Sequence, residues 1–65
     1  MPIVTVQMWE GRTIAQKKQI CADITTSFTK HGVPVDAVVV IFQEGAKCNF
    51  AHAGVLDSEG RPDHK

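Results

Sequence analysis

Apolar and polar residues alternate at the start of the chain, between Ile3 and Trp9. In an extended strand, successive side chains point to opposite faces. One face would carry Val4, Val6 and Met8, and the other Ile3, Thr5 and Gln7. The stretch is rich in β-branched residues, and Glu10 and Gly11 interrupt it. The pattern predicts a short β-strand that ends before Glu10.

A helical pattern follows this strand. The apolar residues that recur on one side are Ile14, Ile20, Cys21, Ile24 and Phe28. Thr13 and Gln16 have the spacing of a capping box, in which each side chain bonds the backbone amide of the other residue. Gly32 suits the left-handed position after a last helical turn, and Pro34 prevents continuation. The polar residues expected in solvent are Lys17, Lys18 and Asp23.

A second strand is indicated by residues 37–42, which are apolar at every position. Such a run is typical of a strand that is buried on both faces. The order strand, helix, strand predicts a parallel pair joined by a helical crossover. From Gln43 onward the chain is polar and dotted with glycine, and we expect a short hairpin within residues 49–56 and a loose tail over residues 58–65. We interpret residues 1–65 as a single α+β domain.

The length of the chain limits what one copy can do alone. A chain of 65 residues is near the lower limit for burying its own core. One helix can cover one face of a two-stranded sheet, so the second face of an apolar strand must meet another chain. The sequence therefore predicts an obligate oligomer in which sheets from neighbouring copies join or pack.

Composition and charge exclude several classes of function. The formal net charge is zero and there is no basic stretch, which argues against nucleic acid as a partner. No apolar run approaches the length of a membrane span, and the first strand lacks the basic flank of a signal peptide. Cys21 and Cys48 fit a reduced protein better than a disulfide scaffold. We expect a cytoplasmic protein without a membrane partner.

Pro2 carries the unusual reactive group of the chain. Once Met1 is removed, Pro2 becomes the N-terminus and its nitrogen is a secondary amine. While Met1 is retained, the same nitrogen is part of an amide and is not a base. Arg12, beyond the next turn, offers a planar cation that suits carboxylates. A base and an anion-binding group are thus both available near the start of the chain.

Three segments of the chain carry a resemblance to known enzymes. They are Pro2, the run Glu10-Gly11-Arg12-Thr13 with Gln16-Lys17, and the run from Glu44 to Phe50. Over nearly all of residues 2–56 the chain resembles the tautomerase superfamily, in particular its short-chain 4-oxalocrotonate tautomerase branch. The resemblance implies a β-α-β unit with a C-terminal β-hairpin, oligomerising through shared sheets as in tautomerase/MIF-like proteins. It also implies a homohexamer, built as a trimer of dimers, and no cofactor.

The activity that the resemblance implies is isomerisation of an unsaturated keto or enol acid, as in the degradation of aromatic compounds. Pro2 would be the general base, taking a proton from a hydroxyl or carbon and returning it to another atom. A free α-amine titrates near about pH 8, so an apolar pocket and a nearby arginine would be needed to lower its proton affinity. Arg12, often contributed by a neighbouring subunit, would hold or polarise the carboxylate. Phe50 would form part of an apolar wall.

Val39 is a departure from the family pattern, because it occupies the position of the second arginine. That arginine normally helps to bind a dicarboxylate, so oxalocrotonate-type activity is in doubt. The pocket would then take a monocarboxylate with an apolar tail, with Trp9 and Phe42 shaping it. Another cation, Lys47 or Arg61, would be an alternative source of the missing charge. A third alternative is a hetero-oligomer in which this chain is catalytically weak and the partner carries the arginine.

His52 suggests a different reaction. In the related trans-3-chloroacrylate dehalogenases, a glutamate after the Asn-Phe pair activates water, and Asn49-Phe50-Ala51-His52 places a histidine near that position. Histidine can act as a base near neutral pH, which would give a hydratase or dehalogenase. Cys48 and His52 lack the paired spacing of structural zinc ligands, so no metal is expected.

Overall fold

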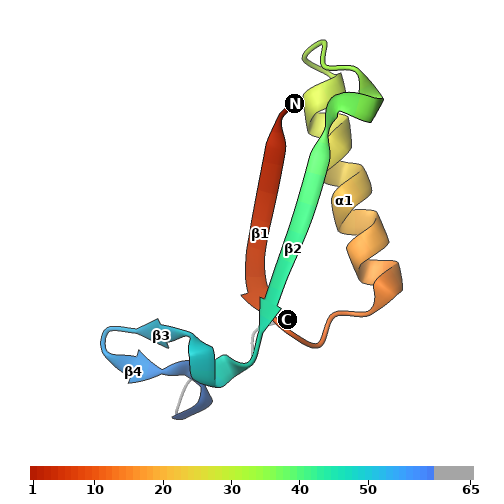
Figure 1. The fold of residues 1–65 in the computed structure, drawn as a ribbon. Helices are drawn as coiled ribbons and strands as arrows, with labels where there is room; N and C mark the ends of the chain where they lie inside the picture. The colour runs from red at the N-terminus through yellow and green to blue at the C-terminus, as the bar shows by residue number, and fades with distance from the viewer. Residues whose placement is uncertain (60–65) are drawn as a thin grey trace.

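The computed structural model describes residues 1–59 as a two-stranded sheet with one long helix and a small hairpin (Figure 1). The strands and the helix are β1 (Ile3–Trp9), α1 (Ile14–Thr29), β2 (Val39–Gly45), β3 (Ala51–His52) and β4 (Val55–Leu56). Three short 3-10 turns lie between or after them, at Val35–Ala37, Lys47–Asn49 and Asp57–Glu59. The expected β-α-β unit with a C-terminal hairpin is confirmed.

β1 and β2 pair in parallel along their whole lengths. Ile3 lies opposite Val39, and Trp9 lies opposite Gly45. Both ends of the pair are extended by a further hydrogen bond: the Val39 amide donates to the Pro2 carbonyl at 2.9 Å, and the Glu10 amide donates to the Gly45 carbonyl at 2.9 Å. The ends of the two strands are therefore held in register.

The ends of α1 follow the local signals in the sequence. The Gln16 amide donates to the Thr13 hydroxyl at 3.1 Å, and the Thr13 amide donates to the Gln16 side-chain oxygen at 2.9 Å. This is the expected capping box. After the C-cap residue Lys30, Gly32 has a φ of 90°, a conformation that costs glycine little. Both helix-end predictions are confirmed.

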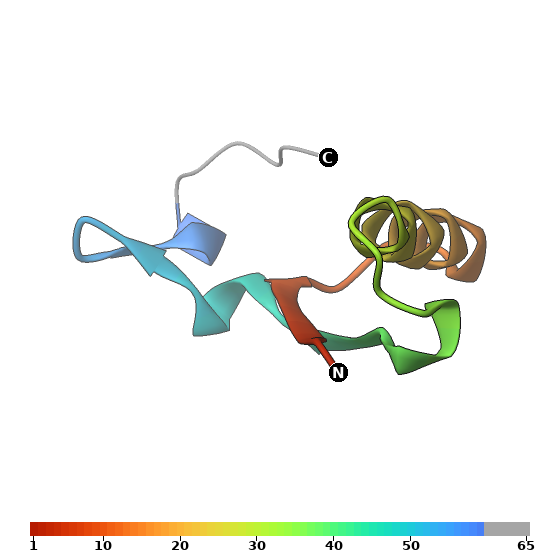
Figure 2. The same cartoon turned by 90° about the horizontal axis from the view of Figure 1, so that it is seen from above.

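α1 covers one face of the sheet and leaves the other open (Figure 2). Even-numbered strand residues on the helix side are half-buried, namely Val4, Val6, Met8, Val40 and Phe42. The odd-numbered residues of the opposite face are exposed, namely Ile3, Thr5, Gln7, Val39, Ile41 and Gln43. We call this second set the open face. At its apolar end, Ile3 is 56% exposed and Ile41 is 41% exposed.

Two residues of α1 differ from the sequence expectation. Ile14 belongs to the apolar stripe by spacing, but it is 67% exposed because the first turn of α1 stands away from the strands (Figure 1). Lys17, expected in solvent, is half-buried and its ammonium lies 2.6 Å from the Glu44 carboxylate. A lysine can cover apolar surface with its alkyl chain while its charged end meets a partner.

The second strand begins later and ends later than its apolar run. Residues Val35–Ala37 form a 3-10 turn closed by the Ala37 amide, which donates to the Pro34 carbonyl at 3.0 Å. The strand then continues to Gly45, because its pairing with β1 continues through polar residues. The limits predicted from hydrophobicity alone, 37–42, were therefore wrong at both ends.

β3 and β4 form the small expected hairpin. Its two-residue loop is Ala53-Gly54, and both residues have positive φ, 51° and 80°. Positive φ at both central positions is the hallmark of the tight turns that suit the twist of paired strands. Ser58 and Glu59, expected in a loose tail, belong to the last 3-10 turn. The rest of that expected tail, residues 60–65, lies outside the described residues.

No apolar side chain within residues 1–59 is fully buried. The radius of gyration is 14.6 Å, against about 11 Å for a compact chain of this length. None of the helices in this part of the chain is long and apolar enough to cross a membrane. The described part of one copy thus has a regular fold without a core of its own.

We predict that Ala53→Asn stabilises the hairpin, because asparagine tolerates the left-handed conformation better than alanine and Asn-Gly is a preferred two-residue loop. The free energy of unfolding should rise by about 0.5–1 kcal/mol. Denaturant unfolding at a fixed protein concentration measures it. Ala51→Asn, on the neighbouring strand without positive φ, is the matched control and should give no gain. A loss of stability in Ala53→Asn would contradict the prediction.

Candidate active site

The sequence-predicted site residues fall into two groups at opposite ends of the sheet. Pro2 and Val39 lie together where β1 and β2 begin, joined by the backbone hydrogen bond between them. Met1, which precedes Pro2, is 73% exposed, so the bond that must be cleaved to free the Pro2 nitrogen is at the surface. The side chain of Val39 is on the open face and 37% exposed.

Arg12, Phe50 and His52 lie near the other end of the sheet. Arg12 is exposed in the connection between β1 and α1, directly after Gly11, whose φ of 121° requires glycine. Phe50 and His52 follow the end of β2. β1 has seven residues, which at about 3.3 Å each span roughly 20 Å. One chain therefore separates Pro2 from Arg12 and Phe50 by the length of a strand.

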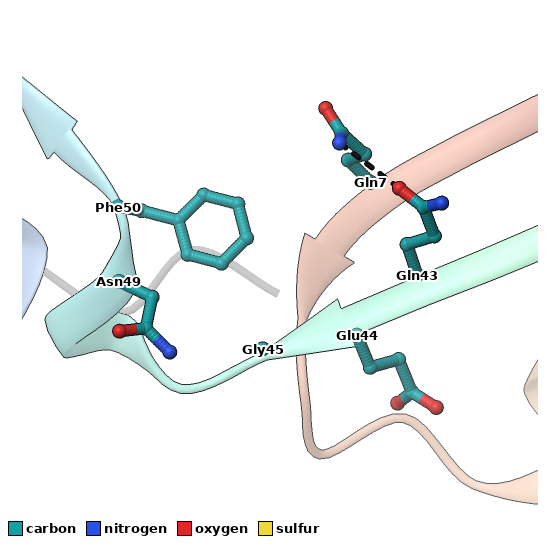
Figure 3. A pocket seen from close by; sticks show the side chains of 6 residues that line it. All are labelled: Gln7, Gln43, Glu44, Gly45, Asn49 and Phe50. Carbon is teal, nitrogen blue, oxygen red and sulfur yellow. Dashed lines mark hydrogen bonds between the residues drawn. The ribbon is translucent and has the colours of Figure 1, made fainter.

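A shallow pocket lies where β2 ends (Figure 3). It has a volume of about 370 Å³ and is lined by Gln7, Gln43, Glu44, Gly45, Asn49 and Phe50. The ring of Phe50 extends toward the side chains of Gln7 and Gln43, and the Gln7 amide donates to the Gln43 oxygen at 3.0 Å. A Cβ atom at Gly45 would stand 3.3 Å from the Phe50 ring, so a small residue lets the ring lie close to the strand.

Neutral polar groups dominate the side of the pocket that faces Phe50. The side-chain oxygen of Gln43 accepts a hydrogen bond from the Gln7 side chain. The NH₂ group of Gln43 is a donor and takes no part in that bond. The carboxylate of Glu44 points to the opposite side of β2 (Figure 3), where it meets Lys17. None of the six lining residues carries a positive charge. The described lining of the pocket therefore offers an aromatic surface and amides, and no cation for a carboxylate.

Asp57 is the one fully buried residue among residues 1–59, with 1% exposure. Its carboxylate accepts a hydrogen bond from the indole Nε1 of Trp9 at 3.0 Å through Oδ2. Its other oxygen, Oδ1, lies 2.7 Å from Nδ1 of His52. The Asp57 amide also donates to the Phe50 carbonyl at 2.8 Å. This cluster ties the last 3-10 turn to β1, to the hairpin and to Phe50.

The Asp57 cluster was missed by reasoning from the sequence. Trp9 and Asp57 are 48 positions apart, and no periodic pattern connects them. The available signal was indirect, since a tryptophan that is not fully exposed usually finds an acceptor for its indole N–H. Trp9 was expected to shape a substrate pocket, which stays a prediction. In the structure its indole N–H donates to Asp57, and the Lys47 ammonium lies 4.9 Å from its ring centre.

The alternatives raised by Val39 can be placed in the fold. Phe42, proposed to shape the pocket, faces α1 from the helix side of β2 and does not line the pocket near Phe50. Lys47, proposed as a replacement cation, lies beyond the end of β2. It is therefore at the opposite end of the strand from Val39 of the same chain. Arg61 lies outside the described residues. Within residues 1–59, no three His, Cys, Asp or Glu residues gather as a metal site.

Comparisons with known proteins agree with this fold. The family model described as tautomerase enzyme matches residues 2–58. A probable tautomerase from Lactococcus lactis is 49% identical over 45 residues, which cover 68% of this chain and 74% of that protein.

Solved structures are similar over most of the chain. The crystal structure of YwhB, a homologue of 4-oxalocrotonate tautomerase, superposes with a TM-score of 0.86 at 34% identity, covering 92% of this chain and all (100%) of that one. A heterohexamer 4-oxalocrotonate tautomerase from Chloroflexus aurantiacus gives a TM-score of 0.85 at 26% identity, covering 94% of this chain and 100% of that one. The chain belongs to the tautomerase enzyme family, in its group of short 4-oxalocrotonate tautomerase-like isomerases.

Proposed function

We propose that this protein is a cofactor-independent keto–enol tautomerase that uses Pro2, after loss of Met1, as its general base. The Pro2 nitrogen takes the proton from the enol hydroxyl of an unsaturated 2-oxo acid and returns it to carbon, which forms the keto product. Arg12 binds the carboxylate and withdraws electrons as negative charge develops. Phe50 excludes water. The observation that carries this proposal is the position of Pro2, fixed at the surface end of a paired strand.

The complete site in this proposal contains parts of more than one copy. Pro2 is separated by the length of β1 from Arg12 and Phe50 of its own chain, so the base of one copy meets the arginine and aromatic of another. The open face supplies the contact, because it carries apolar residues at the Pro2 end that residues 1–59 of the same chain leave exposed. The assembly proposed is a homohexamer built from three dimers.

The proposed substrate is an acid with one carboxylate. Val39 places an aliphatic side chain beside Pro2, and none of the described residues that line the pocket next to Phe50 is positively charged. A second carboxylate would lose its hydration there without gaining an ion pair. A substrate with an uncharged far end would contact the valine and the aromatic ring at lower cost.

Two observations favour functions other than the main one. The contact of His52 with Asp57 favours a second candidate, in which the enzyme adds water to an unsaturated acid with His52 assisting. The heterohexamer among the similar structures favours the other, in which this chain pairs with a second chain that carries the missing arginine. Purified chain that is active without a partner would exclude the latter.

Pro2→Ala should lower kcat/KM for ketonisation of an enol acid by at least about 100-fold, the usual contribution of a positioned general base. The measurement needs wild-type and variant protein whose masses confirm loss of Met1. Pro34→Ala changes a proline outside the proposed site and should retain activity. The same assembly size in all three proteins would show that the fold survives. Unchanged turnover in Pro2→Ala would refute the proposed base.

Val39→Arg should raise kcat/KM for a dicarboxylate enol acid by about 10-fold, because a desolvated ion pair at this position contributes on the order of 1–2 kcal/mol. The wild type should prefer the monocarboxylate. Val39→Gln supplies similar length without charge and is the matched control. Equal gains from glutamine and arginine would show that size, not charge, limits the dicarboxylate.

Ile41→Glu should dissociate the assembly, because it buries a charge in the middle of the open face. Sedimentation velocity should show a shift toward monomer together with loss of ketonisation. Ala22→Glu puts the same side chain on an exposed position of α1 and should leave the sedimentation coefficient unchanged. An intact oligomer in Ile41→Glu would mean that another surface joins the copies.

A further inference from the structure

Asp57 and His52 have the geometry of an oriented base. The Asp57 side chain is 0% exposed, whereas that of His52 is 55% exposed. The 2.7 Å contact uses Nδ1 of the imidazole. Nε2, on the other side of the ring, takes no part in this contact. A buried acid thus holds one ring nitrogen of a histidine that is otherwise open to solvent.

The donor in this contact follows from the chemistry of the groups. An ionised carboxylate only accepts hydrogen bonds, and an indole nitrogen only donates. With Trp9 donating to Oδ2 and His52 facing Oδ1, Nδ1 of His52 must carry its proton for the contact to be favourable. Neutral His52 then has its lone pair on Nε2. This is the orientation that makes an imidazole a proton acceptor.

The position of the pair connects it to the proposed active site. The Asp57 amide donates to the Phe50 carbonyl at 2.8 Å, and His52 follows Phe50 by two residues. Phe50 lines the pocket near the end of β2. The packing that brings Phe50 and Arg12 of one copy to Pro2 of another would therefore bring His52 as well.

We infer that Asp57 is a positioning residue that holds His52 with Nε2 as a second proton-transfer group of the enzyme, an inference that rests on the proposed function. Pro2 takes the hydroxyl proton of the enol, which leaves an enolate, and passes this proton through water to Nε2 of His52. The enolate oxygen then forms the carbonyl, and the electrons of the C=C bond take the proton from the imidazolium. No net proton is gained or lost.

Asp57→Asn tests the role of the carboxylate directly, because Trp9 fixes the orientation of the new amide side chain. The indole N–H requires the asparagine oxygen, so the asparagine NH₂ must face His52 and donate to Nδ1. His52 then carries its proton on Nε2 and can no longer accept there. Asp57→Asn is nearly isosteric, and assembly size and circular dichroism check that it folds. His52→Gln removes the base while keeping a donor for Asp57.

The first readout is the nitrogen-15 chemical shifts of the histidine rings in the intact protein, with His52 assigned by His52→Gln. The wild type should show the proton on Nδ1, and Asp57→Asn should move it to Nε2. The second readout is ketonisation of a monocarboxylate enol acid at neutral pH. Asp57→Asn and His52→Gln should each lower kcat by about 100-fold, with the double variant no worse than either. His31→Gln, at the end of α1, should have no effect.

Three outcomes would overturn the inference. A wild-type His52 that carries its proton on Nε2 overturns it directly. A second outcome is that Pro2→Ala loses turnover while Asp57→Asn and His52→Gln both stay within about threefold of the wild-type kcat. This result overturns the inference and leaves the proposed function intact. Absence of ketonisation by the wild type overturns the proposed function and this inference together.

Discussion

The open face of the β1–β2 sheet is the constraint on which the rest of this structure depends. α1 can cover one side of two strands, and it does so with half-buried side chains and an ion pair between Lys17 and Glu44. The other side presents Ile3, Val39 and Ile41 to solvent in a single copy. Burial of apolar surface is the main force that stabilises a fold, and residues 1–59 of a lone chain bury little of it.

The length of β1 links this constraint to catalysis. A strand is stiff and extended, so it holds groups at its two ends apart, while a pocket for a small acid needs them within a few ångströms. A tautomerase that combines Pro2 with Arg12 and Phe50 therefore needs a neighbouring copy to supply part of the site. In the proposed assembly, the surface that completes the core also completes the active site, and a copy that cannot associate would lose both.

Local signals in the sequence were reliable, and signals between distant segments were not. The capping box at Thr13 and the glycine after α1 depend on a few neighbouring residues, so their positions could be predicted. The start of β2 could not, because Ala37 and Val38 belong to the apolar run, yet Ala37 closes a 3-10 turn after Pro34 and the strand begins only at Val39. Hydrophobicity reports burial, and it does not distinguish a turn from a strand over one or two residues.

The candidate site divides in the same way. Pro2, Arg12 and Phe50 could be singled out through resemblance to a family, whereas Asp57 could not. Its importance comes from burial and from contacts with Trp9 and His52, and a contact across 48 positions leaves no trace in a single sequence. Polar clusters of this kind become visible only when the chain is folded.

The parallel pairing of β1 with β2 also has a consequence for how the molecule forms. Gln7 and Gln43 are bonded across 36 positions, so the strands can meet only after the whole crossover has been closed into a loop. Loop closure costs entropy before the strand pair contributes any stability. A two-stranded sheet with one exposed face then contributes little free energy to offset that cost. The helix can form early from its own caps, whereas in the proposed assembly the strands gain their remaining stability only on encounter with another copy. Folding coupled to that association would be second-order in the chain, and its rate would rise with protein concentration.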